Sequence, residues 1–275
     1  MNDNELKNVA TNVRLDIFRM FRISGRGHLA SALSCVDILV SLYFAPVINL
    51  ERKFSSERDR VILSKGHGCA ALYAVLAEAG YFQKEMLRTF YQYNSLLGGH
   101  PSAELSGIET ATGALGHGIC FGTGTAMAAK LSGSEARTYV LIGDGESEEG
   151  TVWEAAMFAG NHCLDNLTVI LDRNRLQAST WVDEIAPINP VEKKWEAFGW
   201  HVLEVDGHDF KEMRHVFNQA KEWKKQPTIV VANTIKGKGV SFIENNPMWH
   251  SRAPKDEEWN VLCSEYGISM EDLQS

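Results

Sequence analysis

The stretch Thr138-Tyr-Val-Leu-Ile-Gly-Asp-Gly145 decides the fold, because an apolar run ends there abruptly in Gly-Asp-Gly. Such a run is typical of a strand buried in a parallel sheet. A second apolar run, residues 167–172, is followed by Asn174. Asp144 and Asn174 are 30 positions apart, which leaves room for one right-handed crossover helix. Both polar ends are therefore expected at one edge of the sheet, where doubly wound folds bind ligands.

The rest of the chain continues this pattern. Strand-like runs near residues 138–142, 167–172, 201–206 and 227–234 alternate with helical patterns near 151–164, 190–198 and 210–224. Toward the N-terminus we expect helices over 5–23, about 34–44 and 69–78, with a strand over 60–64. The pattern predicts a doubly wound α/β fold, in which a mostly parallel sheet carries helices on both faces. We expect one domain over residues 1–275.

Composition narrows the class of protein. Of the 275 residues, 44% are hydrophobic and 23% are charged, as in ordinary soluble proteins. The net charge of −8 argues against a nucleic-acid-binding surface. The five cysteines are scattered without a Cys-x-x-Cys pair, which favours reduced thiols. The N-terminus has no signal-peptide pattern, and no apolar run is long enough to cross a membrane. These features predict a cytoplasmic protein with neither membrane nor nucleic-acid partners.

The Gly143-Asp144-Gly145 turn has the chemistry of a phosphate and metal site. Its glycines let the backbone approach a phosphate, and Asp144 offers a hard oxygen to Mg²⁺ or Ca²⁺. The tripeptide also occurs in plain turns, so its weight depends on the flanking strands and on Asn174. The sequence contains neither the Gly-x-x-x-x-Gly-Lys-Ser/Thr nor the Gly-x-Gly-x-x-Gly phosphate motif.

Four of the nine histidines lie in predicted loops beside glycine, proline or tryptophan: His28, His67, His100 and His250. Because imidazole exchanges protons near neutral pH and donates to oxygen, we expect these four to share one site. The alternative for any single histidine is a purely structural role with its hydrogen bonds made inside the protein. This alternative fits better the histidines on or beside predicted helices and strands: His162, His201, His208 and His215. His117 is intermediate, since it could cap the helix that follows it.

Acidic side chains follow the Gly-Asp-Gly turn. Residues 146–149 read as a solvated turn and the first turn of a helix, where carboxylates suit the helix dipole. Glu154 stands further along among Ala155, Ala156 and Ala159, so we expect it to be partly buried at an interface.

Six motifs, in order along nearly the whole chain, resemble the transketolase family. They are Arg58-Asp-Arg-Val-Ile-Leu-Ser-Lys-Gly-His67, Gly99-His-Pro101, Thr112-Gly-Ala-Leu-Gly-His-Gly118, the Gly-Asp-Gly segment, Ala197-Phe-Gly-Trp-His-Val-Leu-Glu-Val-Asp-Gly207 and Trp249-His250. Ala114 and His117 depart from the family pattern, in which proline and glutamine are common.

The resemblance implies the thiamine diphosphate-binding fold of the type that holds the diphosphate, with thiamine diphosphate and Mg²⁺ or Ca²⁺ as cofactors. It implies a metal held by Asp144, Asn174 and the main-chain carbonyl of Leu176. It implies catalytic roles in the thiazolium and substrate channel for His28, His67, His100 and His250. The implied cofactor-binding residues are His67, Gly113, Leu115, Gly143, Asp144, Gly145, Glu149, Asn174 and His250. Glu149 and Glu154 match family carboxylates that lie between subunits.

Family enzymes also need a pyrimidine-binding domain and a C-terminal domain, which this sequence does not contain. The resemblance therefore implies the N-terminal subunit of a two-chain transketolase, with sugar phosphates as substrates. Such an enzyme moves a two-carbon ketol unit from a ketose to an aldose through a thiamine diphosphate carbanion. We expect a partner chain with the missing domains, in a heterotetramer. The alternatives are a subunit of a 2-oxoacid dehydrogenase, of a deoxyxylulose phosphate synthase or of a transketolase for an unusual sugar, and a non-catalytic cofactor-binding subunit.

Overall fold

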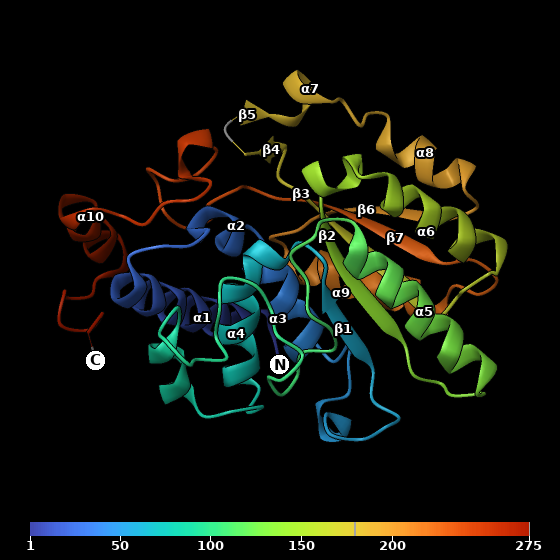
Figure 1. Ribbon diagram of the computed structural model, residues 1–275, viewed down its shortest axis with the longest axis horizontal. Helices are drawn as coiled ribbons and strands as arrows, with labels where there is room; N and C mark the ends of the chain where they lie inside the picture. Colours follow the sequence, from blue (N-terminus) through green and yellow to red (C-terminus); the bar gives the residue numbers. More distant parts are fainter. Residues whose placement is uncertain (179, 275) are drawn as a thin grey trace.

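The computed structural model describes residues 1–178 and 180–274, and its centre is a five-stranded sheet (Figure 1). All neighbouring strands of this sheet run parallel, in the order β1-β2-β3-β7-β6. Their bounds are Arg60–Leu63, Thr138–Gly143, Leu167–Arg173, Thr228–Asn233 and His201–Asp206 in that order. The strands come close to the ranges predicted from the sequence.

Helices cover both faces of the sheet (Figure 1). One face carries α1 (Asp3–Ser24), α2 (Leu29–Ser34), α3 (Val36–Phe44), α4 (Cys69–Glu78), α9 (Phe210–Glu222) and, farther out, α10 (Asp256–Tyr266). The other carries α5 (His117–Leu131), α6 (Gly150–Asn161) and α8 (Val191–Ala197). A small hairpin of β4 (Leu176–Gln177) and β5 (Thr180–Trp181) leads into α7 (Val182–Ile185). The doubly wound α/β fold predicted from the sequence is confirmed.

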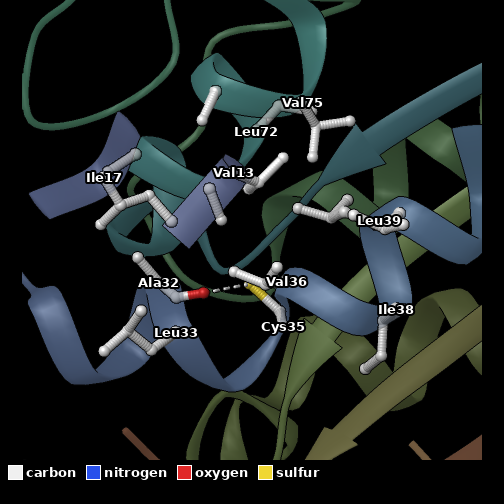
Figure 2. Packing of buried hydrophobic residues seen from close by; sticks show 14 of the residues in the cluster. Val13, Ile17, Ala32, Leu33, Cys35, Val36, Ile38, Leu39, Leu72 and Val75 are labelled. Carbon is white, nitrogen blue, oxygen red and sulfur yellow. Dashed lines mark hydrogen bonds between the residues drawn. The ribbon is translucent and has the colours of Figure 1, made fainter. Parts of the chain in front are cut away.

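Two apolar cores lie on the two faces, because successive strand side chains point in opposite directions. Leu141 and Ile170 pack toward α1–α4, whereas Val140 and Val169 pack toward α5 and α6. Figure 2 shows part of the first core, where side chains of α1, α2, α3 and α4 interlock. A sheet buried on both sides explains why its strands read as continuous apolar runs.

The helix predicted over about 34–44 is confirmed as α3, whereas the short helix α2 before it was not predicted. The structure has two helices, α2 and α3, which are separated at Cys35. Cys35 has φ −102° and ψ 5°. Its amide donates to the carbonyl of Ala32, three residues back, rather than to a carbonyl four residues back as in an α-helix. The Ser34 hydroxyl at this break donates to the Asp172 carboxylate under the sheet edge, 2.5 Å away. This contact ties the end of α2 to β3.

A buried charge cluster ties α1 and α3 to the β6–α9 turn. The Arg14 guanidinium makes two hydrogen bonds to Asp37, at 2.9 and 2.8 Å, and His208 Nδ1 lies 2.7 Å from the same carboxylate. Burial alone would raise the pKa of Asp37, but the charge of Arg14 and the hydrogen bonds from His208 and Arg14 lower it to about 2. His208 is thus a structural residue, as expected.

Within residues 1–178 and 180–274, no helix is both long and apolar enough to cross a bilayer. All five cysteines are free thiols; Cys35, Cys69 and Cys263 are buried, and Cys120 and Cys163 are exposed.

Candidate active site

A cavity of about 360 Å³ opens at the carboxyl edge of β2 and β3. The parallel register pairs Gly143 with Asp172, so the residues that follow both strands emerge side by side. Asp144 and Asn174 both line this cavity, as the strand pattern predicts. All other predicted metal, cofactor and catalytic residues line it too: His28, His67, His100, Gly113, Leu115, Gly143, Gly145, Glu149, Leu176 and His250.

Asp144 is a buried carboxylate without a cationic partner within ion-pair distance in the part of the chain that the structure describes. Its oxygens accept hydrogen bonds from the amides of Gly145 and Arg175. Burial and the nearby charge of Asp172 raise the pKa of Asp144 to about 7, although these amides and Lys65 act against the rise. A cation placed at Asp144 would stabilise its ionised form.

Oxygens from the adjacent turn complete this end of the cavity. The side-chain oxygen of Asn174 accepts from the Leu176 amide at 3.1 Å, which holds the turn. The carbonyl of Leu176 accepts from Lys236 Nζ at 3.2 Å. Carboxylate, amide and carbonyl oxygens are the donors that Mg²⁺ and Ca²⁺ prefer.

Sequence reasoning missed the buried ion pair under this site. Lys65 and Asp172 form a salt bridge, and both side chains are almost fully buried. Burial would raise the pKa of Asp172, but the Lys65 charge more than offsets this and lowers it. Lys65 Nζ also donates to the Ser31 carbonyl at 3.1 Å. The only sequence signal was the position of Lys65 directly before Gly66-His67 and of Asp172 at the end of its strand.

Lys236 was also not predicted as a site residue. Its ammonium lies 3.0 Å from His250 Nδ1. Burial and the charge of Lys65 lower the pKa of Lys236 to about 8, and among the described residues no carboxylate lies within ion-pair distance of it. An anion entering the cavity would be stabilised by this group.

Glu146 contradicts the prediction that residues 146–149 form a solvated turn. It is 3% exposed and accepts hydrogen bonds from the amides of Gly116 and Gly143, at 2.9 and 3.0 Å. The chain after Asp144 forms a short 3₁₀ turn (η4, Gly145–Glu148) that folds this carboxylate back under the cavity. Its role is to tie the loop before α5 to the end of β2.

Three of the four loop histidines are in mutual ring contact. The ring centroids of His28 and His67 are 5.3 Å apart, those of His28 and His250 5.3 Å, and those of His67 and His250 5.7 Å. They come from the α1–α2 loop, the turn before α4 and the turn (η5, Pro247–Trp249) near the end of the chain. The structure therefore brings together residues far apart in sequence, as the histidine pattern predicts.

Burial keeps these imidazoles neutral. Burial, followed by the charge of Lys65, lowers the pKa of His67 well below its usual value. Burial and Lys236 lower the pKa of His250 to about 4. Burial, with His100 and Lys236, also lowers the pKa of His28, whose Nδ1 is buried without a hydrogen-bond partner in the described structure. Neutral rings can both accept and donate protons at pH 7.

His100 reaches the cavity from a separate loop. Its carbonyl accepts from the Tyr73 hydroxyl at 2.9 Å, and its ring packs on Gly113, where a Cβ would lie 3.0 Å from His100 Cδ2. Gly113 has φ +149°, so a side chain there would be strained as well as crowded. His100 is thus fixed against the loop that leads into α5.

The side chain of Glu154 is exposed in this chain, because the neighbouring alanines Ala155, Ala156 and Ala159 occupy the opposite face of α6 against the sheet. Its expected place at a subunit interface stays a prediction. Glu149 is exposed at the cavity rim. His117 does not line the cavity; it begins α5, and its Nδ1 lies 3.1 Å from the Leu115 carbonyl.

Comparison with known proteins decides the family. The model of the thiamine diphosphate-binding domain of transketolase matches residues 6–274. The chain belongs to the transketolase family. Its predicted resemblance is therefore confirmed.

Two relatives that match over most of both chains are named as separate transketolase subunits. An apulose-4-phosphate transketolase subunit of Actinobacillus succinogenes is 46% identical over 242 residues, 87% of each chain. The 6-deoxy-6-sulfo-D-fructose transketolase subunit SqwG of a Clostridium species is 42% identical over 88% of each chain. The crystal structure of Campylobacter jejuni transketolase superposes with a TM-score of 0.91 at 31% identity, covering 98% of this chain and 44% of that one. The chain thus corresponds to less than half of a full-length transketolase.

The cavity fits the transketolase cofactor. The uncompensated Asp144 carboxylate, with the oxygens of Asn174 and Leu176, suits a divalent cation, and Lys236 suits the diphosphate that such a cation binds. The orphaned Nδ1 of His28 supplies a further polar atom for a ligand.

Proposed function

We propose that this chain is the diphosphate-binding subunit of a two-chain transketolase that transfers a two-carbon ketol unit between sugar phosphates. The observation that carries the proposal is a cavity whose lining combines Asp144, Asn174 and Leu176 with all four loop histidines. In this family, thiamine diphosphate supplies the nucleophilic carbon that accepts and releases the ketol unit.

The residues of this chain divide the work. Asp144, Asn174 and the Leu176 carbonyl hold Mg²⁺ or Ca²⁺, and Gly143 and Gly145 let the backbone approach the diphosphate. Gly113 and Leu115 contact the aminopyrimidine from the α5 side. The neutral imidazoles of His28, His67, His100 and His250 accept and return protons of the sugar hydroxyls and orient them by hydrogen bonds.

The α5–α6 face is where we place the contact with the partner chain. Glu149 at the cavity rim and Glu154 on α6 are exposed on this side, beside the exposed apolar side chains of Phe121, Met157 and Phe158. In this proposal the partner carries the pyrimidine-binding and C-terminal domains. Two copies of each chain give the simplest symmetric assembly, a heterotetramer. A cytoplasmic location belongs to the same proposal.

The donor sugar is expected to differ from that of the common pentose phosphate enzymes. Relatives that match 87–90% of this chain are named for apulose 4-phosphate and for 6-deoxy-6-sulfo-D-fructose. We propose a branched or otherwise modified ketose as the natural donor, with xylulose 5-phosphate as a weaker one.

The test is reconstitution. The chain is co-expressed with a transketolase C-terminal subunit from the same genome, and ketol transfer to ribose 5-phosphate is assayed with xylulose 5-phosphate, apulose 4-phosphate and 6-deoxy-6-sulfofructose as donors. Each assay is run with and without thiamine diphosphate and Mg²⁺. Activity that requires both chains and both cofactors supports the proposal.

The matched variants are Asp144→Ala and Asp256→Ala. Removal of Asp144 should lower kcat at least about a hundredfold by loss of the metal. Asp256 sits on the surface in a pair with Arg22, so its removal should leave turnover intact. Unchanged turnover in Asp144→Ala would refute the catalytic proposal. A complex that is inactive with all three donors would indicate that the chain belongs to another thiamine diphosphate enzyme.

A further inference from the structure

We propose that a hydrogen bond between Gln177 and Glu148 joins the two turns that supply the metal ligands, and that this Gln177–Glu148 bridge helps to keep the cation and the diphosphate bound. The inference rests on the proposed function, which assigns Asp144 and Leu176 to the metal. Gln177 and Glu148 are positioning residues in it, because they act through these two ligands.

The assigned ligands come from two separate turns at the carboxyl edge of the sheet. Asp144 directly follows β2, whereas Leu176 begins β4, three residues after the end of β3. A backbone contact joins the turns where the Arg175 amide donates to the Asp144 carboxylate. Groups outside the ligand set that fix the ligands in place strengthen metal binding, because the site then needs less ordering when the cation arrives.

The bridge joins the same two turns by their side chains. Gln177 Nε2 donates to Glu148 Oε1 at 2.5 Å. Gln177 directly follows Leu176, and Glu148 is the last residue of η4, which begins after Asp144. Both side chains are partly buried and line the cavity. Burial raises the pKa of Glu148, and the hydrogen bond from Gln177 acts against this rise, as expected for a charge-assisted bond to the carboxylate.

Close packing at Gly145 indicates how near the two turns lie. A Cβ on Gly145 would be 2.7 Å from Gln177 Cβ and 3.0 Å from Gln177 Oε1. The Gln177 side chain therefore lies directly on the backbone of the residue that follows Asp144. A larger residue at position 145 would push the turns apart, so the second glycine of Gly-Asp-Gly is needed for this contact.

The two turns are held unequally without the bridge. Strands β4 and β5 pair over only two residues each, and Trp181 at the end of this hairpin is 39% exposed. So short a hairpin is marginal by itself. The η4 turn is held more firmly, since its Glu146 is buried and the Ser147 hydroxyl donates to the Gly143 carbonyl at 2.9 Å. The bridge thus attaches the weaker turn, which carries Leu176, to the stronger one.

The test exchanges donor and acceptor. Gln177→Ala removes the bridge, and Gln177→Glu places two carboxylates opposite each other. The double variant Glu148→Gln/Gln177→Glu has a donor and a charged acceptor again, with the composition and net charge of the wild type. The control is Gln219→Ala, on the exposed side of α9 and away from the cavity lining.

The first measurement is independent of turnover. The melting temperature of the complex, and separately of the lone chain, is titrated with Mg²⁺ at a fixed concentration of thiamine diphosphate. The Mg²⁺ concentration needed for a given rise should increase about tenfold in Gln177→Ala and further in Gln177→Glu. The double variant should need less Mg²⁺ than Gln177→Glu, and Gln219→Ala should match the wild type. A purely structural loss would lower the starting melting temperature and leave the Mg²⁺ dependence unchanged.

The second measurement separates cation binding from chemistry. In the reconstituted complex, the Mg²⁺ concentration for half-maximal ketol transfer should rise about tenfold in Gln177→Ala. The kcat at saturating Mg²⁺ should stay within about twofold of the wild type, because the bridge acts on binding and not on the reacting atoms. A kcat that Mg²⁺ does not restore would contradict this role.

The outcomes separate the two proposals. A wild-type complex that is stabilised by Mg²⁺ and thiamine diphosphate but transfers no ketol unit refutes the proposed function, and the melting temperatures then still test the bridge. An unchanged Mg²⁺ dependence in Gln177→Ala, or a double variant as weak as Gln177→Glu, overturns the bridge alone. A wild type that the two cofactors do not stabilise overturns both proposals.

Discussion

Helices α4 and α5 are both rich in small residues, yet their surroundings differ. In α4, residues 69–77 are all buried among α1, α2 and α3. In α5, only the residues that face the sheet are buried, and Phe121 and Leu131 are 54% and 78% exposed. Helix α6, packed beside α5, exposes Met157 and Phe158 as well.

The difference in burial between α4 and α5 distinguishes the two faces of the sheet. The α1–α4 face has a closed core and carries the loops of His28, His67 and His100. The α5–α6 face buries its small residues on the strands and leaves large apolar ones outside. Large exposed apolar side chains on two neighbouring helices are typical of an interaction site. The α1–α4 face is therefore covered by the chain itself, and the α5–α6 face is the one that we assign to the partner chain.

The largest effect on stability is expected in the apolar core of the α1–α4 face. Leu72→Ala removes a buried side chain of α4 that packs in the core shown in Figure 2. The free energy of unfolding should fall by about 2–5 kcal/mol, measured by urea denaturation. Leu131→Ala, on the exposed side of α5, is the control and should change it by less than about 0.5 kcal/mol. Equal losses of unfolding free energy in both variants would show that the two helices are packed equally well.

Two glycines of α5 sharpen the contrast within one helix. A Cβ on Gly122 would overlap Val140 on β2, whereas one on Gly124 would have no neighbour within 4 Å. We expect Gly122→Ala to be less stable than Gly124→Ala by about 1–3 kcal/mol, because only the first must push the helix off the sheet. Thermal unfolding of the two variants gives the difference directly. Identical melting temperatures would mean that α5 does not pack this closely.

The buried cluster of Arg14, Asp37 and His208 on the α1–α4 face predicts that the free energy of unfolding depends on pH. Because the pKa of Asp37 is lowered to about 2 in the folded state, its stabilisation is full above the unfolded value near 3.8 and is lost as the pH falls through 2. The loss should be about 2 kcal/mol. Urea denaturation between pH 5 and pH 2 measures it, and Asp37→Asn should remove this part of the slope. A variant with the wild-type slope would show that Arg14 and His208 do not stabilise the ionised carboxylate.

The smallest effect on the lone chain is expected on the exposed face. Phe121→Ser should change its stability by less than about 0.5 kcal/mol. If the α5–α6 face receives the partner, the same change should weaken association about tenfold or more, since buried aromatic side chains dominate interfaces. Titration calorimetry between the two chains measures this, with Phe54→Ser as an exposed control away from that face. Equal affinities for both variants would place the partner elsewhere.

Much of the architecture could be predicted because parallel strands and their polar ends are local signals. The runs before Asp144 and Asn174 indicated adjacent strands, and the register bears this out. The two-residue strands β4 and β5 went unpredicted because so short a hairpin has no period to detect. Helix α2 was not predicted; its last residue, Ser34, contacts Asp172, 138 positions away, and no local pattern contains that contact.

The site was predictable where residue type alone implies chemistry. The four loop histidines and the Gly-Asp-Gly turn indicated their common cavity. Lys65, Glu146 and Lys236 were not singled out, because a lysine or glutamate in a sequence usually reads as a solvated surface residue. Their burial follows from partners that only the fold supplies, such as Asp172 for Lys65 and two backbone amides for Glu146. Glu154 is exposed in this chain, since its alanine neighbours face the sheet and it does not, and its place at an interface stays a prediction.

The most direct test of the account is the affinity for thiamine diphosphate with Mg²⁺, measured by titration calorimetry on the lone chain and on its complex with the partner. The account predicts weak binding to the lone chain, binding at least about tenfold tighter in the complex, and loss of binding in both with Asp144→Ala. Lone-chain affinity equal to that of the complex would contradict a cofactor site shared between two chains, and tight binding by Asp144→Ala would contradict the metal site itself.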